Sequence, residues 1–278
     1  PARLLAVAVN LYRTLVRRVI HWRRLLRDAR IDLVHLNNAC GFDHDLMLAC
    51  RLERIPCVVH ERGIQRSIGM RTRYFANRAD RLIAISDAVA NNLRRYGVDA
   101  ARILRINDGI DPERLVEHES AAAVRRRLGL APDRPVIGIV GNIKPWKGQL
   151  IVMQALGRLL PEFPELHCLF VGSIADPEYA ERMRRSAAEM SVPDAAYTFT
   201  GYESHPTDLM RAMDIVIHAS VDPEPFGIVL LEAMAVARPL IASAAGAPRE
   251  IVINGQTGLL VKPGDPDALA AAVARLLA

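Results

Sequence analysis

Residues 221–250 read VDPEPFGIVLLEAMAVARPLIASAAGAPRE, and this stretch is the starting point for predicting the fold. Glu224 and Glu232 stand either side of a Pro-Phe-Gly turn, and an apolar helix is predicted to begin at about Gly227. The start of such a helix presents free backbone N–H groups and the positive end of its dipole. These features suit a ligand that carries hydroxyls or phosphate. A core helix with polar residues at its ends is the structural alternative, and the spacing alone leaves both open.

Short apolar runs alternate with helical patterns along the whole chain. Strands are predicted at residues 31–38, 55–63, 79–86, 136–140, 166–173, 214–220 and 238–243. This alternation indicates βαβ units and a parallel sheet. The carboxyl ends of parallel strands face the ligand crevice, so His60, near the end of its strand, is well placed for function. A structural role for a lone histidine is an equal alternative.

The length of the chain favours two domains. Its 278 residues exceed a usual single domain, and 51% apolar residues are enough for two cores. Residues 112–135 are polar, rich in arginine and contain three prolines. We predict an N-terminal domain over residues 1–115, a linker over 116–134 and a C-terminal domain over 135–278. Both ends fall inside helical patterns, so we expect a chain that is truncated at both ends.

Charge is unevenly distributed between the two halves. Residues 1–130 hold 24 arginines and 14 acidic residues, whereas residues 131–278 hold 12 basic and 17 acidic residues. The first half is therefore expected to face an anionic partner, such as a membrane surface, and we expect no nucleic acid.

A long amphipathic helix is predicted over residues 3–30. Its apolar positions recur at spacings of three and four: Leu4, Ala8, Leu11, Leu15, Val19, Trp22 and Leu26. Arginines fall largely on the other side: Arg13, Arg17, Arg24 and Arg27. The pattern fits either a helix that lies on anionic lipid headgroups or an ordinary packed helix with a solvated face.

The cysteines and the apolar runs bear on location. Four cysteines show no metal-ligand spacing, which favours free thiols in a reducing compartment. No apolar run approaches the ~18 residues that span a bilayer. We expect a cytoplasmic protein, peripheral at the inner membrane face. Asp43 and Asp45 form a D-x-D pair that binds a divalent metal in some enzymes, but a helix capped by Asp43 explains them as well.

A loop with two lysines follows the strand at 136–140. Lys144 and Lys147 lie between Gly141 and Gly148, where the next helix is predicted to start. Backbone N–H groups and two ammonium charges could bind a diphosphate there. The loop matches neither G-x-G-x-x-G nor the Walker A pattern, and a solvated loop is the alternative.

Several segments together resemble the retaining GT-B glycosyltransferases, in particular family 4. The matching motifs follow in the order of that family: INDGID (106–111), VGNIKPWKGQ (140–149), YTFTGY (197–202), DIVIHAS (214–220), EPFGIVLLE (224–232) and NGQTGLLVKPGD (254–265). The similarity extends from about residue 32 to the end. It implies an α/β fold with two Rossmann-like parallel-sheet domains facing a cleft, of which the N-terminal domain is incomplete.

The resemblance implies three catalytic residues. Glu224 would hold hydroxyls of the donor sugar, and Lys147 would neutralise the departing diphosphate. His60 would approach the reacting centre. Neither glutamate would be a nucleophile, because in this class the acceptor attacks the face that the leaving group vacates.

The remaining matches would bind the donor, a UDP- or GDP-sugar. Glu232 would bind the ribose hydroxyls, and the backbone near Phe226 and Gly227 would support the sugar. Asn142 stands where many members have an arginine, and Lys144 is expected to compensate. The resemblance implies no cofactor and no required metal.

The activity implied is retaining transfer of a sugar to a glycan, lipid-linked or small-molecule acceptor. A non-catalytic fragment that binds the nucleotide sugar is the alternative, because the first strand and glycine-rich loop of family members are not found here. A GT-B-like epimerase, or a phosphorylase that uses pyridoxal phosphate, is disfavoured, since no lysine stands where a Schiff base is expected.

Overall fold

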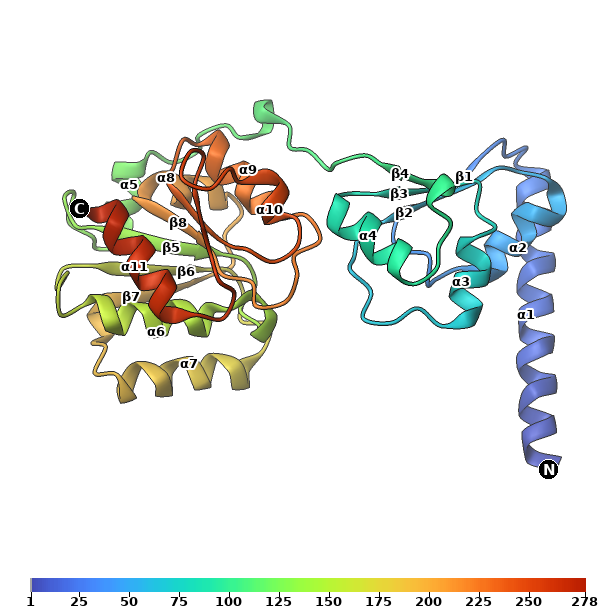
Figure 1. Cartoon of the computed structure of the whole chain (residues 1–278), viewed down its shortest axis with the longest axis horizontal. Helices are drawn as coiled ribbons and strands as arrows, with labels where there is room; N and C mark the ends of the chain where they lie inside the picture. The colour runs from blue at the N-terminus through green and yellow to red at the C-terminus, as the bar shows by residue number, and fades with distance from the viewer. Residues whose placement is uncertain (1) are drawn as a thin grey trace. The chain divides into compact units, whose positions relative to one another are not determined.

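The computed structural model describes residues 2–278, apart from the side chains of residues 2–12 and of Arg114. The chain divides into two compact units, Pro1–Asp108 (unit 1) and Gly109–Ala278 (unit 2). Each unit holds one sheet in which all strand pairs are parallel, as the alternation of strands and helices predicted (Figure 1). The α/β fold class is confirmed.

Unit 1 is built on a four-stranded sheet in the order β1-β2-β3-β4. Its strands are β1 (Val34–Leu36), β2 (Cys57–Glu61), β3 (Arg81–Ala84) and β4 (Ile103–Arg105). Its helices are α1 (Ala2–Asp28), α2 (His44–Glu53), α3 (Met70–Ala76), α4 (Asp87–Arg95) and the 3₁₀ turn η1 (Ala100–Arg102).

The helix predicted over residues 3–30 is present as α1, which packs along α2. Val19 and Leu26 on its apolar side are buried. Leu4, Ala8 and Leu11, predicted on the same side, are among the side chains outside the described part. Within the part of the chain that the structure describes, none of the helices is both long and apolar enough to cross a membrane.

Of the D-x-D pair, Asp45 has a packing role, and Asp43 stands at the start of α2 as predicted but does not cap it through its side chain. The Asp45 carboxylate is buried, where it accepts from Trp22 Nε1 at 3.1 Å and pairs with Arg18 at 2.7 Å. Asp43 is the N-cap residue of α2, but its side chain makes no capping hydrogen bond. The backbone of Asp43 is left-handed (φ 52°), whereas a side-chain cap needs extended backbone at this position.

Unit 2 is built on a six-stranded sheet in the order β10-β9-β8-β5-β6-β7. Its strands are β5 (Val136–Val140), β6 (His167–Val171), β7 (Tyr197–Gly201), β8 (Ile215–His218), β9 (Leu240–Ser243) and β10 (Leu259–Val261). Its α-helices are α5 (Ala121–Arg127), α6 (Gln149–Leu159), α7 (Pro177–Glu189), α8 (Pro206–Ala212), α9 (Ile228–Ala235), α10 (Pro248–Ile251) and α11 (Pro266–Leu277). Three 3₁₀ turns complete it: η2 (Pro112–Arg114), η3 (Pro145–Lys147) and η4 (Asp194–Ala196).

The strand order of unit 2 reverses next to β5. The chain runs outward from β5 through β6 to β7, and then returns to the other side of β5 to lay down β8, β9 and β10. This is the doubly wound order, in which the crevice for a ligand opens at the carboxyl ends of the two strands flanking the reversal. Here those strands are β5 and β8.

Both faces of the second sheet are covered by helices. Successive strand side chains point to opposite faces, so Ile137 and Ile139 pack with α6, α7 and α11, whereas Val136 packs with α5, α8 and α9. The near-continuous apolar strands of this half follow from burial on both sides.

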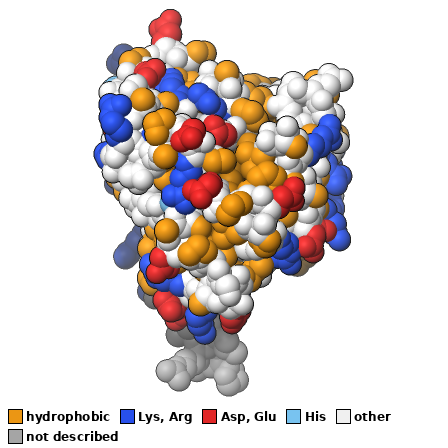
Figure 2. All heavy atoms as spheres, turned by 90° about the vertical axis from the view of Figure 1, so that its left-hand side faces the viewer, with side chains coloured by type: hydrophobic (Ala, Val, Ile, Leu, Met, Phe, Trp, Pro, Cys, Tyr) orange, Lys and Arg blue, Asp and Glu red, His pale blue; other side chains and the backbone are white. Residues whose placement is uncertain are grey.

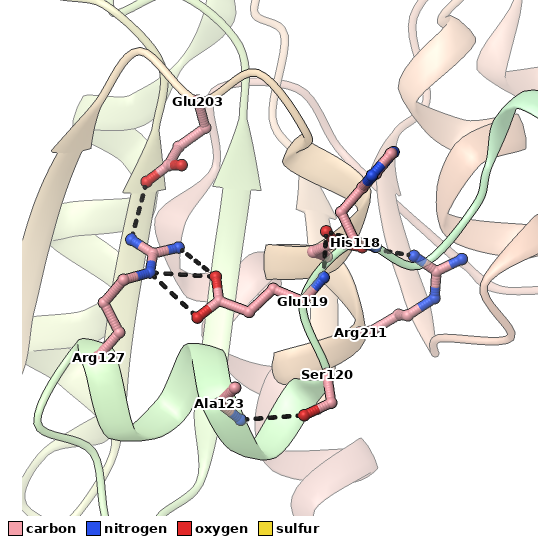
Figure 3. A network of polar contacts seen from close by, with 8 residues as sticks. His118, Glu119, Ser120, Ala123, Arg127, Glu203 and Arg211 are labelled. Carbon is pink, nitrogen blue, oxygen red and sulfur yellow. Dashed lines mark hydrogen bonds and ion pairs between the residues drawn. The ribbon is translucent and has the colours of Figure 1, made fainter.

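The predicted linker is attached to unit 2 by polar contacts (Figure 3). The buried Asp208 carboxylate accepts hydrogen bonds from the backbone N–H groups of His118 (3.2 Å) and Glu119 (3.0 Å). Arg127 pairs with both Glu119 and Glu203. Helix α5 of this segment packs on α8. The polar, arginine-rich composition conceals these contacts, so the segment reads as a linker in the sequence.

Candidate functional site

The candidate site lies where the chain leaves β5 and β8. Loop 141–148 follows β5 and loop 219–227 follows β8 (Figure 1). The Val221 N–H donates to the Trp146 carbonyl at 2.9 Å, which joins the two loops. At Gly148 (φ 76°) a Cβ atom would lie 2.0 Å from the carbonyl oxygen of Ala219. Only glycine permits this close approach of the loops.

Glu224 is the centre of the cluster between these loops. Glu224 is 6% exposed, and three side chains reach the same carboxylate oxygen, Oε2. Lys147 Nζ lies at 2.9 Å, the Ser220 hydroxyl at 2.9 Å and His218 Nε2 at 3.0 Å. Among the described residues, no hydrogen bond or ion pair uses Oε1. One carboxylate oxygen is therefore fixed and the other is available to a ligand.

The charge of Glu224 follows from these contacts. Burial by itself would raise the pKa of this carboxyl, but the hydrogen bond from His218 and the positive charge of Lys147 outweigh it and lower the pKa to about 2. Glu224 is thus ionised at neutral pH and can only accept hydrogen bonds.

The backbone of Glu224 is held by the segment after β9. Its N–H donates to the Ala245 carbonyl at 3.1 Å, and its own carbonyl accepts from the Ala247 N–H at 2.9 Å. Gly246 (φ 78°) crosses so closely that a Cβ atom would lie 2.3 Å from the Glu224 carbonyl oxygen. Three loops therefore determine where this carboxylate sits.

Helix α9 starts immediately after Glu224, as predicted. Gly227 is its N-cap residue (φ 95°), no side chain caps it, and Phe226 is buried beside it. The first N–H groups of the helix therefore lack partners within it. Glu232 lies in the second turn, where burial raises its pKa. Among the described residues its carboxylate has no hydrogen-bond partner, so the two glutamates of the motif lie in opposite environments.

The two predicted lysines flank one indole ring. Lys144 Nζ lies 5.0 Å and Lys147 Nζ 4.0 Å from the centre of the Trp146 ring. Asn142 is exposed, and its backbone carbonyl accepts from Gln149 Nε2 at 3.0 Å. The structure thus brings Lys144 and Lys147 to the loop that contacts Glu224.

His60 belongs to unit 1, near the carboxyl end of β2 as predicted. It stacks on His35 with 5.5 Å between ring centres. Its Nε2 atom is buried and has no hydrogen-bond partner among the described residues. Burial, followed by the nearby charge of Arg62, lowers the pKa of His60, so the ring is neutral at pH 7.

His218 and Ser220 are members of the cluster that sequence reasoning missed. Both lie at the end of the strand predicted at 214–220, six and four positions before Glu224. A polar pair at the end of an otherwise apolar strand is a usable signal, because strand ends of this kind face the crevice.

A cavity of about 300 Å³ in unit 2 is not part of this site. It is lined by Pro239 and Leu240 at the start of β9, by Gly258 and Leu259 at the start of β10, and by the end of α11. These belong to the amino edge of the sheet, opposite the edge that carries Glu224. The side of unit 2 with the end of α11 shows apolar side chains at its centre and charged ones around them (Figure 2). Convergent charge places the candidate site at the Glu224 edge instead.

The model of the family described as "Glycosyl transferases group 1" matches residues 121–278. The chain belongs to this glycosyl transferase family. A second family model, "Glycosyltransferase Family 4", matches residues 3–114 of this chain. Among the described residues, no group of three or more His, Cys, Asp or Glu side chains is arranged to hold a metal ion. The family resemblance seen in the sequence is confirmed.

Curated relatives of this chain are longer than the chain itself. It is 35% identical over 207 residues to D-inositol 3-phosphate glycosyltransferase 2 of Catenulispora acidiphila, covering 72% of this chain and 48% of the relative. It is 30% identical over 214 residues to a GDP-mannose-dependent alpha-(1-6)-phosphatidylinositol monomannoside mannosyltransferase of Mycolicibacterium smegmatis, covering 74% and 55%. The chain spans about half the length of these relatives.

Solved structures of glycosyltransferases share its fold. The structure of HepE of Anabaena in complex with UDP matches with a TM-score of 0.85 and 26% identity, over 93% of this chain and 72% of that one. A glycosyltransferase of Rickettsia africae matches with a TM-score of 0.85 and 22% identity, over 95% and 71%. The GT-B fold expected from the sequence is confirmed by these neighbours.

Proposed function

We propose that this chain is part of a retaining glycosyltransferase that binds a UDP-sugar at the carboxyl ends of β5 and β8. The observation that carries the proposal is the ionised Glu224 carboxylate held 2.9 Å from the Lys147 ammonium at the chain reversal of unit 2. A free carboxylate oxygen suits sugar hydroxyls, and the ammonium suits a diphosphate. The similar HepE structures contain UDP and UDP-glucose, and for this reason we favour UDP. GDP is the alternative, because one relative is named as GDP-mannose-dependent.

Three residues carry the reaction in this proposal. Glu224 orients the sugar through Oε1, and Lys147 stabilises the negative charge that grows on the diphosphate as the bond to the sugar breaks. His60 of unit 1 is assigned its role in the reaction as a neutral ring whose Nε2 atom has no hydrogen-bond partner among the described residues. The acceptor hydroxyl oxygen bonds to the anomeric carbon on the face that the diphosphate leaves and gives its proton to the departing phosphate, which retains the anomeric configuration.

The other residues of the site bind the nucleotide. The uncapped N–H groups after Phe226 and Gly227 face the donor, and Glu232 binds the ribose hydroxyls. The Glu232 carboxylate is partly buried and unpartnered. Hydrogen bonds from the ribose hydroxyls would therefore offset part of the free-energy cost of its desolvation. Lys144 adds a second positive charge beside Asn142, with no cofactor and no metal required.

The acceptor is a glycan, a lipid-linked sugar or a small molecule, and α1 favours one at an anionic membrane surface. Arg13, Arg17 and Arg24 are exposed on α1, and the apolar Ile20 between them is 44% exposed. An exposed basic face with an apolar residue suits the headgroups of anionic lipids. We therefore place the protein at the inner, cytoplasmic face of the membrane.

Calorimetric titration with UDP and GDP tests the donor site. We expect UDP to bind wild type, and Lys147→Ala and Glu224→Ala to reduce transfer at least a hundredfold in the full-length enzyme while leaving it folded. Lys262→Ala is the matched control, because the Lys262 side chain is 78% exposed and lies outside the site. Normal turnover by either site variant would refute the roles given to these residues.

A second candidate function is nucleotide-sugar binding without catalysis. A donor-hydrolysis assay beside the titration separates the two. Binding of UDP with neither hydrolysis nor transfer supports the non-catalytic alternative.

A further inference from the structure

A cavity of about 220 Å³ lies at the amino edge of the sheet of unit 1. Pro56, which leads into β2, and Asp80, which leads into β3, form part of its wall. Three arginines line it: Arg51 and Arg54 at the end of α2, and Arg78 after α3. We call this cavity the arginine pocket.

The arginine pocket carries an excess of positive charge. Among the described residues, none of its three guanidinium groups forms an ion pair with a carboxylate, although the neighbouring Arg23 on α1 pairs with Glu53 of α2. Asp80 is the one acidic residue in the described lining, and its Oδ2 already accepts the backbone N–H of Cys57 at 2.8 Å. An anion that enters the pocket meets three unneutralised cations.

One of the arginines, Arg78, has its guanidinium held in place before any ligand binds, and a second, Arg54, has an unusual backbone. The Arg78 guanidinium carbon lies 3.4 Å from the centre of the Tyr74 ring, and its Nη1 donates to the Tyr74 carbonyl at 3.2 Å. Arg54 is the C-cap residue of α2 and has a left-handed backbone (φ 59°), a position that glycine or asparagine usually occupies. An ordered guanidinium loses less freedom on binding, which favours affinity.

A smaller apolar cavity adjoins the pocket. It measures about 50 Å³ and shares Arg51, Cys57 and Arg78 with the larger one. Tyr74 and Phe75 form its apolar wall. The two cavities together present cationic groups beside a narrow apolar recess.

We propose that the arginine pocket binds a phosphate-bearing anion, with its phosphoryl group between Arg51, Arg54 and Arg78. Guanidinium groups bind phosphoryl oxygens through paired, charge-assisted hydrogen bonds, and the adjoining recess accepts a small apolar group next to the phosphate. The ligand is a soluble phosphate compound or a lipid phosphate headgroup, since both present the same phosphoryl oxygens.

This site is separate from the candidate donor site and does not rest on the proposed function. The pocket meets β2 at Cys57, its first residue, whereas His60 lies three residues along the strand, roughly 10 Å away. Glu224 and Lys147 belong to unit 2.

Titration calorimetry of the whole chain with inorganic pyrophosphate tests the proposal. We expect wild type to bind, and Arg51→Gln and Arg54→Gly each to weaken binding at least tenfold. Arg54→Gly relieves the left-handed arginine, so its melting temperature should be equal to or above that of wild type, and lost binding would not reflect unfolding. Arg95→Gln, an exposed arginine on α4 outside the pocket, is the matched control and should bind like wild type.

Two further arms locate the binding and identify its source. Lys147→Gln removes the ammonium of unit 2 and should leave pyrophosphate binding at the arginine pocket unchanged. Co-sedimentation with phosphatidic acid vesicles that Arg54→Gly abolishes and Arg95→Gln retains would identify a lipid headgroup, whereas pyrophosphate binding without sedimentation would identify a soluble ligand. Absence of pyrophosphate binding in wild type, wild-type affinity in both pocket variants, or binding abolished by Lys147→Gln would overturn the proposal.

Discussion

Replacing Glu224 by glutamine tests whether the charge of this carboxylate stabilises unit 2. Despite burial, its contacts lower the pKa of Glu224 from 4.5 to about 2, a difference of about 2.5 that corresponds to roughly 3 kcal/mol at pH 7. A carboxyl whose pKa is lower in the folded than in the unfolded state stabilises the fold above pH 4.5. That stabilisation is lost as the pH falls from 4.5 toward 2.

Glutamine keeps the shape of the side chain and removes its charge, so Glu224→Gln resembles the protonated state. We expect the free energy of unfolding of unit 2 to fall by roughly 3 kcal/mol at pH 7, and by about half as much at pH 3. The difference between variant and wild type should vanish near pH 2. Because Glu224 is only 6% exposed, solvent screening reduces this effect little.

Urea unfolding followed by tryptophan fluorescence measures this difference. The chain has two tryptophans, Trp22 on α1 and Trp146 beside Lys147, so a Trp22→Phe background makes Trp146 the reporter of unit 2. Transitions would be recorded at pH 7, 5 and 3, with an unchanged dependence on urea as the sign that only stability differs.

The reasoning would be refuted if Glu224→Gln lowered the free energy of unfolding by less than about 1 kcal/mol at pH 7, which is the contribution of an ordinary exposed ion pair. An equal loss at pH 3 and pH 7 would refute it as well. In that case the cluster would act through shape and not through the charge of Glu224.

Four further changes probe the packing around the sites. Glu232→Gln should raise the melting temperature of unit 2 at pH 7 and leave it unchanged at pH 4. Burial raises the pKa of Glu232, so its ionisation destabilises the fold as the pH rises above 4.5. A lower melting temperature of the variant at pH 7 would contradict this. Gly246→Ala should lower the free energy of unfolding by about 2–4 kcal/mol in urea, because the new methyl group would meet the Glu224 carbonyl oxygen at 2.3 Å. Asp208→Ala should lower the free energy of unfolding by about 2 kcal/mol and speed hydrogen exchange of the backbone N–H groups of His118 and Glu119, which donate to Asp208. Unchanged exchange would argue against that contact. Arg54→Gly should raise the free energy of unfolding by up to about 1 kcal/mol, since glycine removes the Cβ strain of a left-handed position. Differential scanning calorimetry can detect the gain.

Most elements of unit 2 could be predicted because its four central strands, β5, β6, β8 and β9, are buried on both faces. The run VIGIV at 136–140 is apolar throughout, the run at 214–220 is apolar over residues 215–217, and glycine or aspartate marks the helix starts that follow. Asp265 caps α11 by accepting from the Ala268 N–H at 3.0 Å. The cap at Asp43 failed because side-chain capping depends on the backbone angle of the residue, which the residue type does not determine.

The contact between Lys147 and Glu224 could not be predicted from pattern alone. The two residues are 77 positions apart, and alternation of strands and helices specifies a parallel sheet without specifying that β8 lies beside β5. Family resemblance assigned both residues to one donor, but only the strand order explains why their loops meet. His218 was overlooked for the same reason, since its role appears only when Glu224 folds back over the end of β8.

These overlooked residues explain how one lysine can serve both the carboxylate and a diphosphate. In the proposed reaction Lys147 must turn toward the diphosphate, which weakens its 2.9 Å contact with Glu224. His218 and Ser220 still hold Oε2 at 3.0 and 2.9 Å, so the carboxylate keeps its orientation. The pKa of about 2 lies so far below 7 that Glu224 stays ionised even after losing part of the attraction of Lys147. In the proposed reaction the histidine and the serine thus leave the lysine available to the ligand while Glu224 remains fixed and charged.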